Sequence, residues 1–364
     1  MYISKIYLKN FRNYEEQTVS LKEKVNIVYG KNAQGKTNLL ESMFLCSSGR
    51  SHRTAKDHEL IKEGQVSYNV KIEGFRDDIP FNIGIYFEKD GRKTITINNL
   101  KVKKLGELMG VLNAVIFSPE DLQIIKRGPG DRRRFLDILI CQTHPAYFYK
   151  LQTYMRIVKQ KNSLLRKYEI KGTKEDLLEV FNIKQAETGA DIVAEREKFI
   201  GDIKDKLQEN HSKLTKGKEK IEIKYVTSSG KKSDHAEEFK KVLDNNKKKE
   251  IRNGASLYGP HRDDLEFYIN GSDLKAYGSQ GQQRTAVLSL KLTEIDIIRE
   301  MTGFSPVLLL DDVMSELDVS RKKYLLENIN TRQTIITGTE KRTYAAFENI
   351  STFYQVINGT IENR

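Results

Sequence analysis

Cysteines and long apolar stretches are both scarce in this chain of 364 residues, and each shortage excludes a class of protein. The two cysteines, Cys46 and Cys141, are too few for a disulfide scaffold or for an ordinary cysteine-based zinc site. Apolar runs stay below the about 18 residues that a membrane-spanning helix needs. The first residues, Met1 to Phe11, alternate apolar and charged side chains and lack the apolar core of a signal peptide. These absences favour a cytoplasmic protein without a membrane partner.

Positive charge is in excess, because 62 Lys and Arg face 50 Asp and Glu, which gives a formal net charge of +12. Hydrophobic residues make up 38% of the chain and charged residues 31%, so the chain can build a core and is not a disordered polymer. A positive balance of this size favours polyanionic partners such as nucleic acid.

The chain divides into three segments of different texture. Strand signals dominate the first 115 residues, including an alternating apolar run over 81–87 and an Asp90-Gly91 turn into 94–97. Helical periodicity runs from Arg133 to about Leu214, and strand signals return after residue 251. The later strands are expected over 265–269, 307–310, 334–336 and 353–356. We therefore predict one α/β domain built from 1–120 plus 251–364, with a helical domain inserted over 121–250.

A phosphate-binding loop is the clearest motif. The segment Gly30-Lys31-Asn32-Ala33-Gln34-Gly35-Lys36-Thr37 matches GxxxxGK[ST] at every fixed position. An apolar strand over 25–29 precedes the loop, and a helical run over 38–45 follows it. Loop N–H groups would hold phosphate oxygens, Lys36 would lie between the β- and γ-phosphates, and Thr37 would offer its hydroxyl to Mg²⁺. The motif predicts binding of a nucleoside triphosphate.

An acidic pair follows the apolar run over 307–310, which is typical of a central parallel strand buried on both faces. We expect Asp311 to hold Mg²⁺ and Asp312 to orient or deprotonate the attacking water. A helix N-cap is the alternative for two adjacent carboxylates. Lys36 and Asp311 are 275 positions apart, which argues against small GTPases and nucleotide kinases. This spacing fits a split ATPase domain with an insertion.

A third motif, Ser279-Gln280-Gly281-Gln282, stands immediately before a strongly helical run and about 23 residues before the acidic strand. It resembles the signature motif of ABC-type ATPases, in which a hydroxyl and free N–H groups at a helix N-terminus bind phosphate. In that family the motif completes the ATP site of a second subunit. The resemblance therefore implies that Ser279, Gly281 and Gln282 contact ATP across a dimer interface. A plain Gly-Ser-Gln loop is the alternative.

Further segments resemble the RecF family of bacterial DNA repair ATPases, which is related to the SMC and ABC families. Residues 6–14 are similar to the first strand and turn of SMC-like heads. The segments 117–122 and 128–137 look like the family's own central signature, and the resemblance continues through 257–264 and 310–318. It covers essentially the full length.

The resemblance implies an ABC/SMC-type P-loop ATPase head with an inserted helical domain. It implies slow, DNA-stimulated hydrolysis of the β–γ phosphoanhydride bond of ATP, an ATP-dependent homodimer, and ATP and Mg²⁺ as cofactors. It also implies binding to double-stranded DNA and to single-strand/double-strand junctions in the nucleoid. There the protein would work with RecO and RecR, loading recombinase onto single-stranded DNA during recombinational repair and replication restart.

The resemblance also assigns individual residues. Arg12 and Asn32 match positions that look toward the γ-phosphate in SMC-like heads, and residues 315–318 are similar to the D-loop at the dimer interface. Asp312 stands where most ABC ATPases carry Glu, which is consistent with slow turnover. The strand over 334–337 lacks the switch histidine of transporters. The Q-loop position stays open between Glu120, Asp121 and Gln123.

Contacts to DNA are expected from basic side chains, because the sequence shows no zinc finger, helix-turn-helix or aromatic RNA-binding signature. Such contacts to phosphate are independent of base sequence and depend strongly on salt. The candidate residues are Lys126, Arg127, Arg132, Arg133 and Arg134, with Lys101, Lys103, Lys104 and the Lys-rich region after 213. Arginines 132–134 also begin a helix and could instead pair with Asp131 or Asp137.

Two rival hypotheses come from the same superfamily. A transporter ATPase subunit usually carries a switch histidine, which this chain lacks. An SMC-like structural protein needs a long coiled-coil arm, and about 80 periodic residues folded back on themselves are too few for one.

Overall fold

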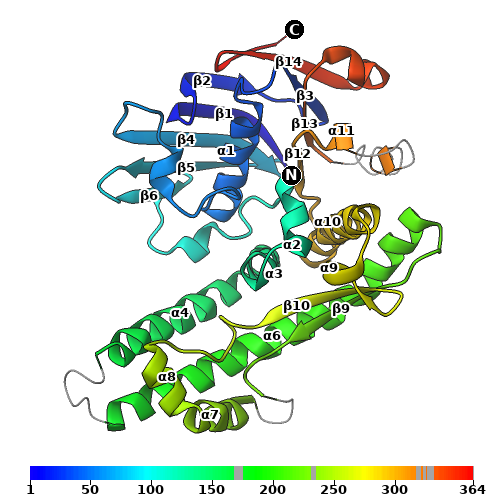
Figure 1. The fold of residues 1–364 in the computed structure, drawn as a ribbon. Coiled ribbons are helices and arrows are strands. Elements are labelled where there is room, and N and C mark those ends of the chain that lie inside the picture. The colour runs from blue at the N-terminus through cyan, green and yellow to red at the C-terminus, as the bar shows by residue number, and fades with distance from the viewer. Residues whose placement is uncertain (168–174, 231–234, 317–320, 323–324, 326–331, 364) are drawn as a thin grey trace. The chain divides into compact units, whose positions relative to one another are not determined.

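The computed structural model describes residues 1–167, 175–230, 235–316, 321–322, 325 and 332–363 (Figure 1). The chain forms two compact units. Unit 1 contains Met1–Asp121 and Glu294–Arg364, and unit 2 contains Leu122–Thr293. The mixed α/β architecture agrees with the fold class expected from the motifs.

Unit 1 contains an antiparallel sheet of six strands in the order β2-β1-β4-β5-β6-β7. Its strands are β1 (Tyr2–Phe11), β2 (Tyr14–Ser20), β4 (Ser67–Arg76), β5 (Ile79–Glu88), β6 (Lys93–Ile97) and β7 (Leu100–Lys101). The expected hairpin is present, because Ile83 pairs with Ile97 and Ile85 pairs with Ile95. Ile83, Ile85, Phe87 and Ile95 are buried, so the alternating pattern places one face of the hairpin in the core.

The second sheet of unit 1 is mainly parallel and has the order β15-β14-β3-β13-β12-β8. Its strands are β3 (Val25–Tyr29), β8 (Ala114–Phe117), β12 (Val307–Leu310), β13 (Thr334–Gly338), β14 (Ser351–Ile357) and β15 (Thr360–Asn363). All four residues of β12 are buried between β8 and β13, as expected for a strand covered on both faces. Both ends of the chain therefore build one sheet.

Helix α1 (Lys36–Ser48) contacts strands of both sheets in unit 1, namely β4 and β5 of the antiparallel sheet and β8 and β13 of the parallel sheet (Figure 1). Polar and small side chains such as Glu41, Ser42 and Ser47 are buried together with the apolar ones. A helix covered on two sides has no broad solvent face, so its buried polar groups need partners inside the protein. The partner of Glu41 becomes important at the site.

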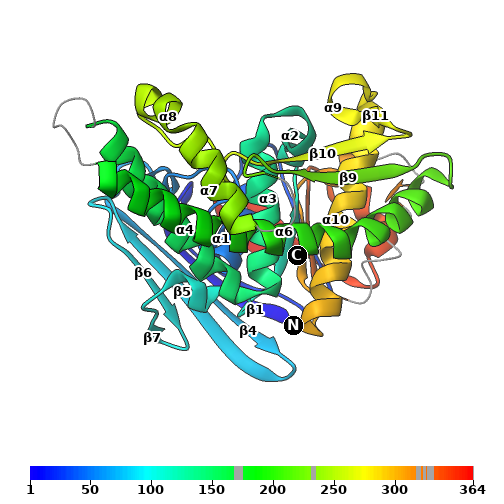
Figure 2. The same ribbon diagram turned by 90° about the horizontal axis from the view of Figure 1, so that it is seen from below.

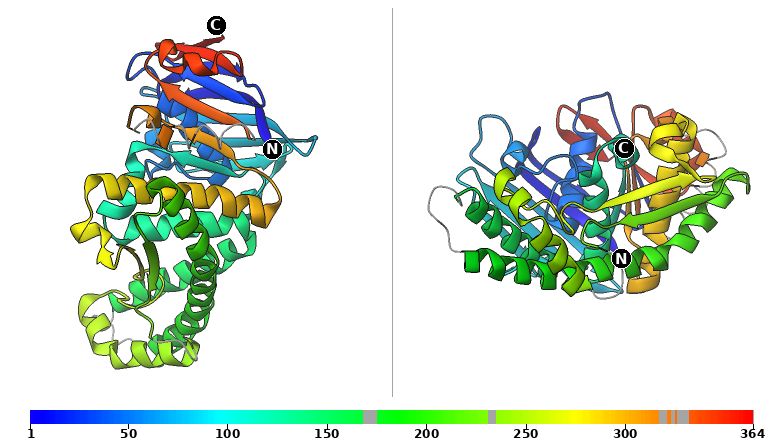
Figure 3. Two further views of the ribbon diagram at one scale, coloured as in Figure 1. Left: turned by 90° about the vertical axis from the view of Figure 1, so that its right-hand side faces the viewer. Right: turned by 60° about the horizontal axis from the view of Figure 1, so that its bottom comes forward.

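Unit 2 is mainly helical. Its longer helices are α3 (Pro129–Thr143), α4 (Pro145–Leu165), α6 (Glu175–Thr215) and α7 (His235–Asn245), with shorter α2 (Gln123–Lys126), α8 (Lys247–Asn253) and α9 (Leu274–Tyr277). Helix α6 packs against α4 and α7, and the three run close together in Figures 2 and 3. Helices α3, α4 and α6 account for the periodicity expected between Arg133 and Leu214.

The second boundary between the units differs from the expected one and lies after residue 293 rather than 250. Strand β10 (Asp264–Ile269) pairs antiparallel with β9 (Ile221–Val226) and β11 (Ser272–Asp273), which places it in unit 2. Helix α10 (Gln280–Thr302) crosses the boundary. Because β10 pairs with β9, residues 251–293 belong to unit 2 and not to the head in which they were expected. The strand at 221–226 lies within the segment 121–250 that was expected to form a helical domain.

A buried ion pair connects two helices of unit 2. The Nζ of Lys161 in α4 lies 2.6 Å from Oε2 of Glu250 in α8, and the two side chains are 0% and 1% exposed. Lys161 also donates to Oε1 of Gln185, and Glu250 accepts from the backbone N–H of Leu257. Burial lowers the pKa of Lys161, and the nearby Glu250 opposes that change. Each buried charge is neutralised by the other.

We predict that Lys161→Met destabilises unit 2 by about 3–5 kcal/mol, because Glu250 is left as an unpaired buried charge. Native-state hydrogen exchange of the amides in α4 and α6 in the full chain measures this loss. The matched control is Lys240→Met, which breaks an exposed pair with Asp244 and is expected to cost less than about 1 kcal/mol. Equal exchange rates in the two variants would contradict the prediction.

Candidate nucleotide site

The phosphate-binding loop connects β3 to α1, and both elements are buried in unit 1. Gly35 caps α1 with φ 116°, and Ala33 has φ 63°, so the loop contains left-handed backbone that favours glycine. A Cβ added to Gly35 would lie 2.6 Å from Nδ2 of Asn13. The motif glycine is therefore required by close packing as well as by the backbone conformation.

Two turns hold the loop in place. In the turn between β1 and β2, Asn13 Nδ2 donates to the Gln34 carbonyl at 2.9 Å and the Tyr14 hydroxyl donates to the Gly35 carbonyl at 2.9 Å. In the turn between β14 and β15, the backbone N–H of Asn358 donates to Gln34 Oε1 at 2.5 Å. The loop backbone is therefore fixed from both sheets of unit 1. Asn32 is exposed at the tip of the loop.

Lys36 is folded back over its own loop. Its Nζ donates to the carbonyls of Gly30 and Lys31, both at 2.8 Å, and the residue is 8% exposed. Burial lowers the pKa of Lys36, and the carboxylates of Asp312 and Asp311 oppose that change. The ammonium therefore lies at the loop, close enough to both carboxylates to interact with them electrostatically.

Thr37 and Asp311, expected to share Mg²⁺, are in direct contact. The Thr37 hydroxyl donates to Asp311 Oδ1 at 2.9 Å, and Asp311 is 5% exposed at the end of β12. Burial raises the pKa of Asp311, while hydrogen bonds from Thr337 and Thr37 partly oppose this. A hydroxyl and a carboxylate are oxygen donors of the kind that Mg²⁺ prefers when phosphate supplies further oxygens. The donor set therefore fits that metal.

Thr337, at the end of β13, was not identified from the sequence. Its hydroxyl donates to Asp311 Oδ1 at 2.7 Å, and it accepts from the backbone N–H of Asp312 at 3.0 Å. The Thr337 carbonyl in turn accepts from the Tyr344 hydroxyl at 3.0 Å. One threonine thus fixes both acidic residues. The one signal in the sequence is that Thr337 belongs to the strand segment 334–337, where transporters carry the switch histidine.

Asp312 adopts φ 51°, a left-handed backbone that is uncommon for a residue other than glycine. Burial raises the pKa of Tyr344 to about 12, and the nearby carboxylate of Asp312 acts in the same direction. The Asp312 side chain therefore lies near the Tyr344 hydroxyl. The backbone therefore turns sharply at Asp312, two residues after β12 ends at Leu310. Of the D-loop-like segment that follows, Leu317 and Asp318 lie outside the described residues.

Arg12, expected to face the γ-phosphate, is engaged elsewhere. Its Nε and NH2 donate to the two oxygens of Glu41 at 2.9 and 2.8 Å, and its NH1 donates to the Glu59 carbonyl at 2.8 Å. Ser51 also donates to Glu41, and Arg53 lies 3.6 Å from it. Burial alone would raise the pKa of Glu41, but these partners outweigh it and lower the pKa. Arg12 therefore neutralises a buried carboxylate of α1.

Arg53 also reaches the first turn of α1, because its NH1 donates to Asn38 Oδ1 at 3.2 Å. Its Nε lies 3.9 Å from Glu120, one of the three Q-loop candidates. Asp121, the second candidate, accepts from the Ser118 N–H through its carboxylate. The third candidate, Gln123, belongs to unit 2. The Q-loop position stays open.

The Ser279 motif begins α10 in unit 2 and forms a reciprocal cap. Ser279 Oγ accepts from the Gln282 N–H at 3.2 Å, and Gln282 Oε1 accepts from the Ser279 N–H at 2.9 Å. Ser279 and Gly281 are exposed. The start of α10 is therefore exposed to solvent, as an anion site requires.

A partly buried hydrogen-bond network supports this cap. Gln282 Nε2 donates to Glu219 Oε1 at 3.0 Å, and Glu219 Oε2 lies 3.3 Å from Nε2 of His211. The other ring nitrogen of His211 lies 2.9 Å from the Ser289 hydroxyl in α10. Glu219 thus connects the end of α6 to the motif. Sequence spacing gave no indication of it.

The expected DNA residues differ in availability. Lys126 and Arg127 are exposed, whereas Arg132 is 4% exposed and donates to both oxygens of Asp264 at 2.6 and 2.8 Å. Arg133 donates to the Asp263 carbonyl, and burial lowers its pKa. Arg132 is thus held in a buried ion pair, and its partner is Asp264 rather than the Asp131 or Asp137 suggested by the sequence. Arg134 is half-buried and has a partner of its own.

Comparison with known families matches residues 2–362 to the RecF/RecN/SMC N-terminal domain. The DNA replication and repair protein RecF of Acetivibrio thermocellus is 48% identical over 354 residues, covering 96% of this chain and 95% of the relative. The protein of the same name from Clostridium perfringens is 42% identical over 364 residues and covers 100% of both chains. The similarity therefore spans both units.

Solved structures give the same relationship. The recombination mediator protein RecF-ATPrS in the RecFOR pathway has a TM-score of 0.92 and 40% identity, covering 100% of this chain and 98% of that one. The Smc head domain from Pyrococcus furiosus has a TM-score of 0.54 and 18% identity, covering 100% and 96%, and supports the fold alone.

No helix in the described part of the chain is long and apolar enough to cross a bilayer. The full-length match to RecF does not favour a transporter subunit or an SMC-like structural protein. The chain belongs to the RecF family and has the SMC-type ATPase fold.

Proposed function

We propose that this chain is an ATP-switched, DNA-binding recombination mediator that dimerises when ATP is bound and hydrolyses ATP slowly. Relatives named as DNA replication and repair proteins, and a solved RecF-ATP structure with 39% identity, support this function. The observation that carries it is the contact between Thr37 of the phosphate loop and Asp311 of the buried strand. Only a chain that folds both motifs into one sheet brings the two side chains together.

The residues divide the chemistry between them. Loop N–H groups and Lys36 bind the phosphates, and Thr37 and Asp311 would hold Mg²⁺, which would supply positive charge against the phosphates. Asp312 orients the attacking water; its short side chain and fixed backbone are consistent with slow turnover. Ser279, Gly281 and Gln282 of a second copy close the site over the γ-phosphate. DNA duplexes and junctions, RecO and RecR are the proposed partners.

Each ATP site of the dimer is a composite site, made of the phosphate loop of one copy and the Ser279 motif of the other. We predict that Lys36→Arg and Ser279→Arg each abolish ATP-dependent dimerisation, because in a homodimer each substitution damages both composite sites. Light scattering after size-exclusion chromatography in ATP measures the oligomeric state.

Mixing the two variants supplies the sharper control. The Ser279→Arg chain keeps an intact phosphate loop, and the Lys36→Arg chain keeps an intact Ser279 motif. The mixed dimer therefore contains one complete site. Dimers and partial ATPase activity should return only in the mixture. Normal dimers of either variant alone would refute the composite site.

Glu219→Ala is predicted to weaken ATP-dependent dimerisation about tenfold, because a hydrogen bond to a charged group contributes about 1.5 kcal/mol or more. ATP binding by the monomer should not change, since Glu219 and the phosphate loop belong to different units. The control is Glu222→Ala, whose carboxylate pairs with Lys220 at 3.0 Å on the surface. Equal dimer dissociation constants for the two variants would remove Glu219 from the mechanism.

Thr337→Val is predicted to lower ATPase activity at neutral pH about tenfold, because Asp311 loses a donor and the Asp312 N–H loses its acceptor. The Thr337 hydrogen bond lowers the pKa of Asp311, so its removal raises that pKa. The carboxylate then becomes protonated at a higher pH, and the acidic limb of the pH–rate profile shifts upward. Thr337→Ser keeps the hydroxyl and should retain the wild-type profile; a valine profile identical to wild type would contradict the role.

A further inference from the structure

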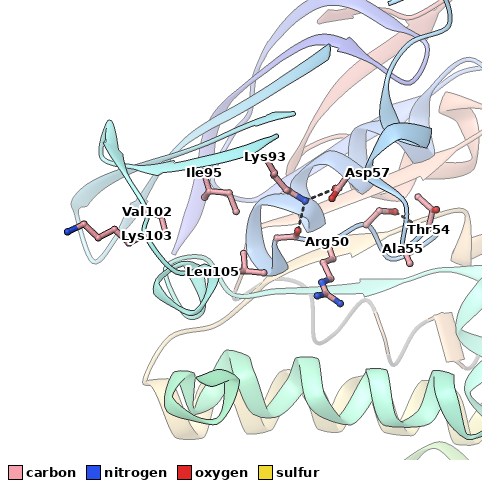
Figure 4. A pocket seen from close by; sticks show the side chains of 11 residues that line it. Arg50, Thr54, Ala55, Asp57, Lys93, Ile95, Val102, Lys103 and Leu105 are labelled. Atoms are coloured by element: carbon pink, nitrogen blue, oxygen red, sulfur yellow. Dashed lines mark hydrogen bonds and ion pairs between the residues drawn. The ribbon is translucent and has the colours of Figure 1, made fainter. Parts of the chain in front are cut away.

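A basic pocket lies in unit 1 outside the residues assigned to ATP. It has a volume of about 420 Å³ and is formed by the segment after α1, strand β6 and the segment after β7 (Figure 4). Its charged lining residues are Arg50, Asp57, Lys93 and Lys103, so three positive charges face one negative charge. Ser51 and Thr54 add hydroxyl groups. The excess charge indicates an anionic ligand.

One of the three cations is already neutralised. Lys93 Nζ lies 2.5 Å from Asp57 Oδ1 and donates to the Gly49 carbonyl at 2.8 Å, so it anchors the wall of the pocket (Figure 4). Burial lowers the pKa of Lys93, and Asp57 opposes this change. The carbonyl of Gly49 stands at the C-terminal end of α1.

The other two cations are available. Arg50 and Lys103 are exposed, and within the described residues neither side chain has an ion-pair or hydrogen-bond partner. In Figure 4 Arg50 lies below the Lys93–Asp57 pair, and Lys103 extends outward on the opposite side of the pocket from Thr54. Lys101, on β7, is also exposed. Charge therefore continues from the pocket along the neighbouring surface, as an extended polyanion requires.

The uncharged lining argues against a free nucleotide. Besides Ser51 and Thr54 it consists of Gly49, Ala55, Ile95, Val102 and Leu105, with no aromatic ring on which a base could stack. Gly49 closes the space beside Leu105, because an added Cβ there would lie 2.4 Å from Leu105 Cδ1. Unpaired cations without a stacking ring match a sugar–phosphate backbone, which is bound independently of sequence.

We propose that the basic pocket binds the sugar–phosphate backbone of nucleic acid, with Arg50 and Lys103 each contacting a separate phosphate. This inference rests on the proposed DNA-binding function and adds a site to it. Ser51 lines the same pocket and donates to Glu41 of α1. The bound backbone would therefore lie beside the network in which Arg53 contacts the first turn of α1.

The test is the salt dependence of binding to a short fluorescein-labelled DNA duplex in the presence of ATP, measured by anisotropy. Each phosphate contact contributes about 0.9 to the slope of log affinity against log salt concentration. The double variant Arg50→Ala with Lys103→Ala should therefore lower the slope by about two. Between about 50 and 200 mM salt, its affinity should fall about tenfold less than that of the wild type.

The matched control removes the same charge elsewhere in unit 1. Lys22 and Lys24 are exposed, have no ion-pair partner within the described chain and do not line the pocket. Their double alanine variant should keep the wild-type slope. ATP affinity should be unchanged in both double variants, which shows that the phosphate loop is intact.

Two results would overturn the pocket while leaving the proposed function in place. One is a wild-type slope in the Arg50 and Lys103 variant, and the other is an equal loss in the Lys22 and Lys24 variant. If the wild-type protein with ATP does not bind the duplex at all, the proposed function and the pocket are both wrong.

Discussion

The hydrogen bond between the Thr37 hydroxyl and Asp311 depends on the order of strands in the parallel sheet. Thr37 follows β3 and Asp311 follows β12, and β13 lies between these two strands. Thr337 at the end of β13 completes the contact by bonding to Asp311 as well. The two ends of the chain must therefore pair before the site exists. Neither the segment before unit 2 nor the segment after it can form the metal side alone.

The parts of the site that the sequence could predict are those set by local spacing. The phosphate loop, the apolar strand before Asp311 and the Ser279 corner each occupy a few consecutive residues with a fixed chemical requirement. Thr337, Glu41 and Glu219 could not be found in this way. Each acts through a contact with a distant residue, and that contact follows from sheet order or helix packing.

The partners of Arg12 and Arg132 and the boundary between the units also could not be predicted from local sequence. A basic side chain in a motif can bind phosphate or form an ion pair with a buried carboxylate, and only the packing around it decides between the two. In this structure Arg12 pairs with Glu41 and Arg132 pairs with Asp264. A buried carboxylate without such a partner would be strongly unfavourable. The strand expected over 265–269 is present, but its pairing with 221–226 depends on a contact between distant segments. The sequence therefore placed it in the wrong unit.

Each half of the proposed composite site is held by contacts within its own unit. Asn13, Tyr14 and Asn358 fix the phosphate loop in unit 1, while Gln282 and Glu219 fix the Ser279 corner in unit 2. Groups that are already ordered lose less conformational freedom when they meet a ligand. Little of the binding free energy of ATP would therefore be lost in ordering the phosphate loop or the Ser279 motif. More of that energy remains to hold two copies together, which is what a switch based on dimerisation requires.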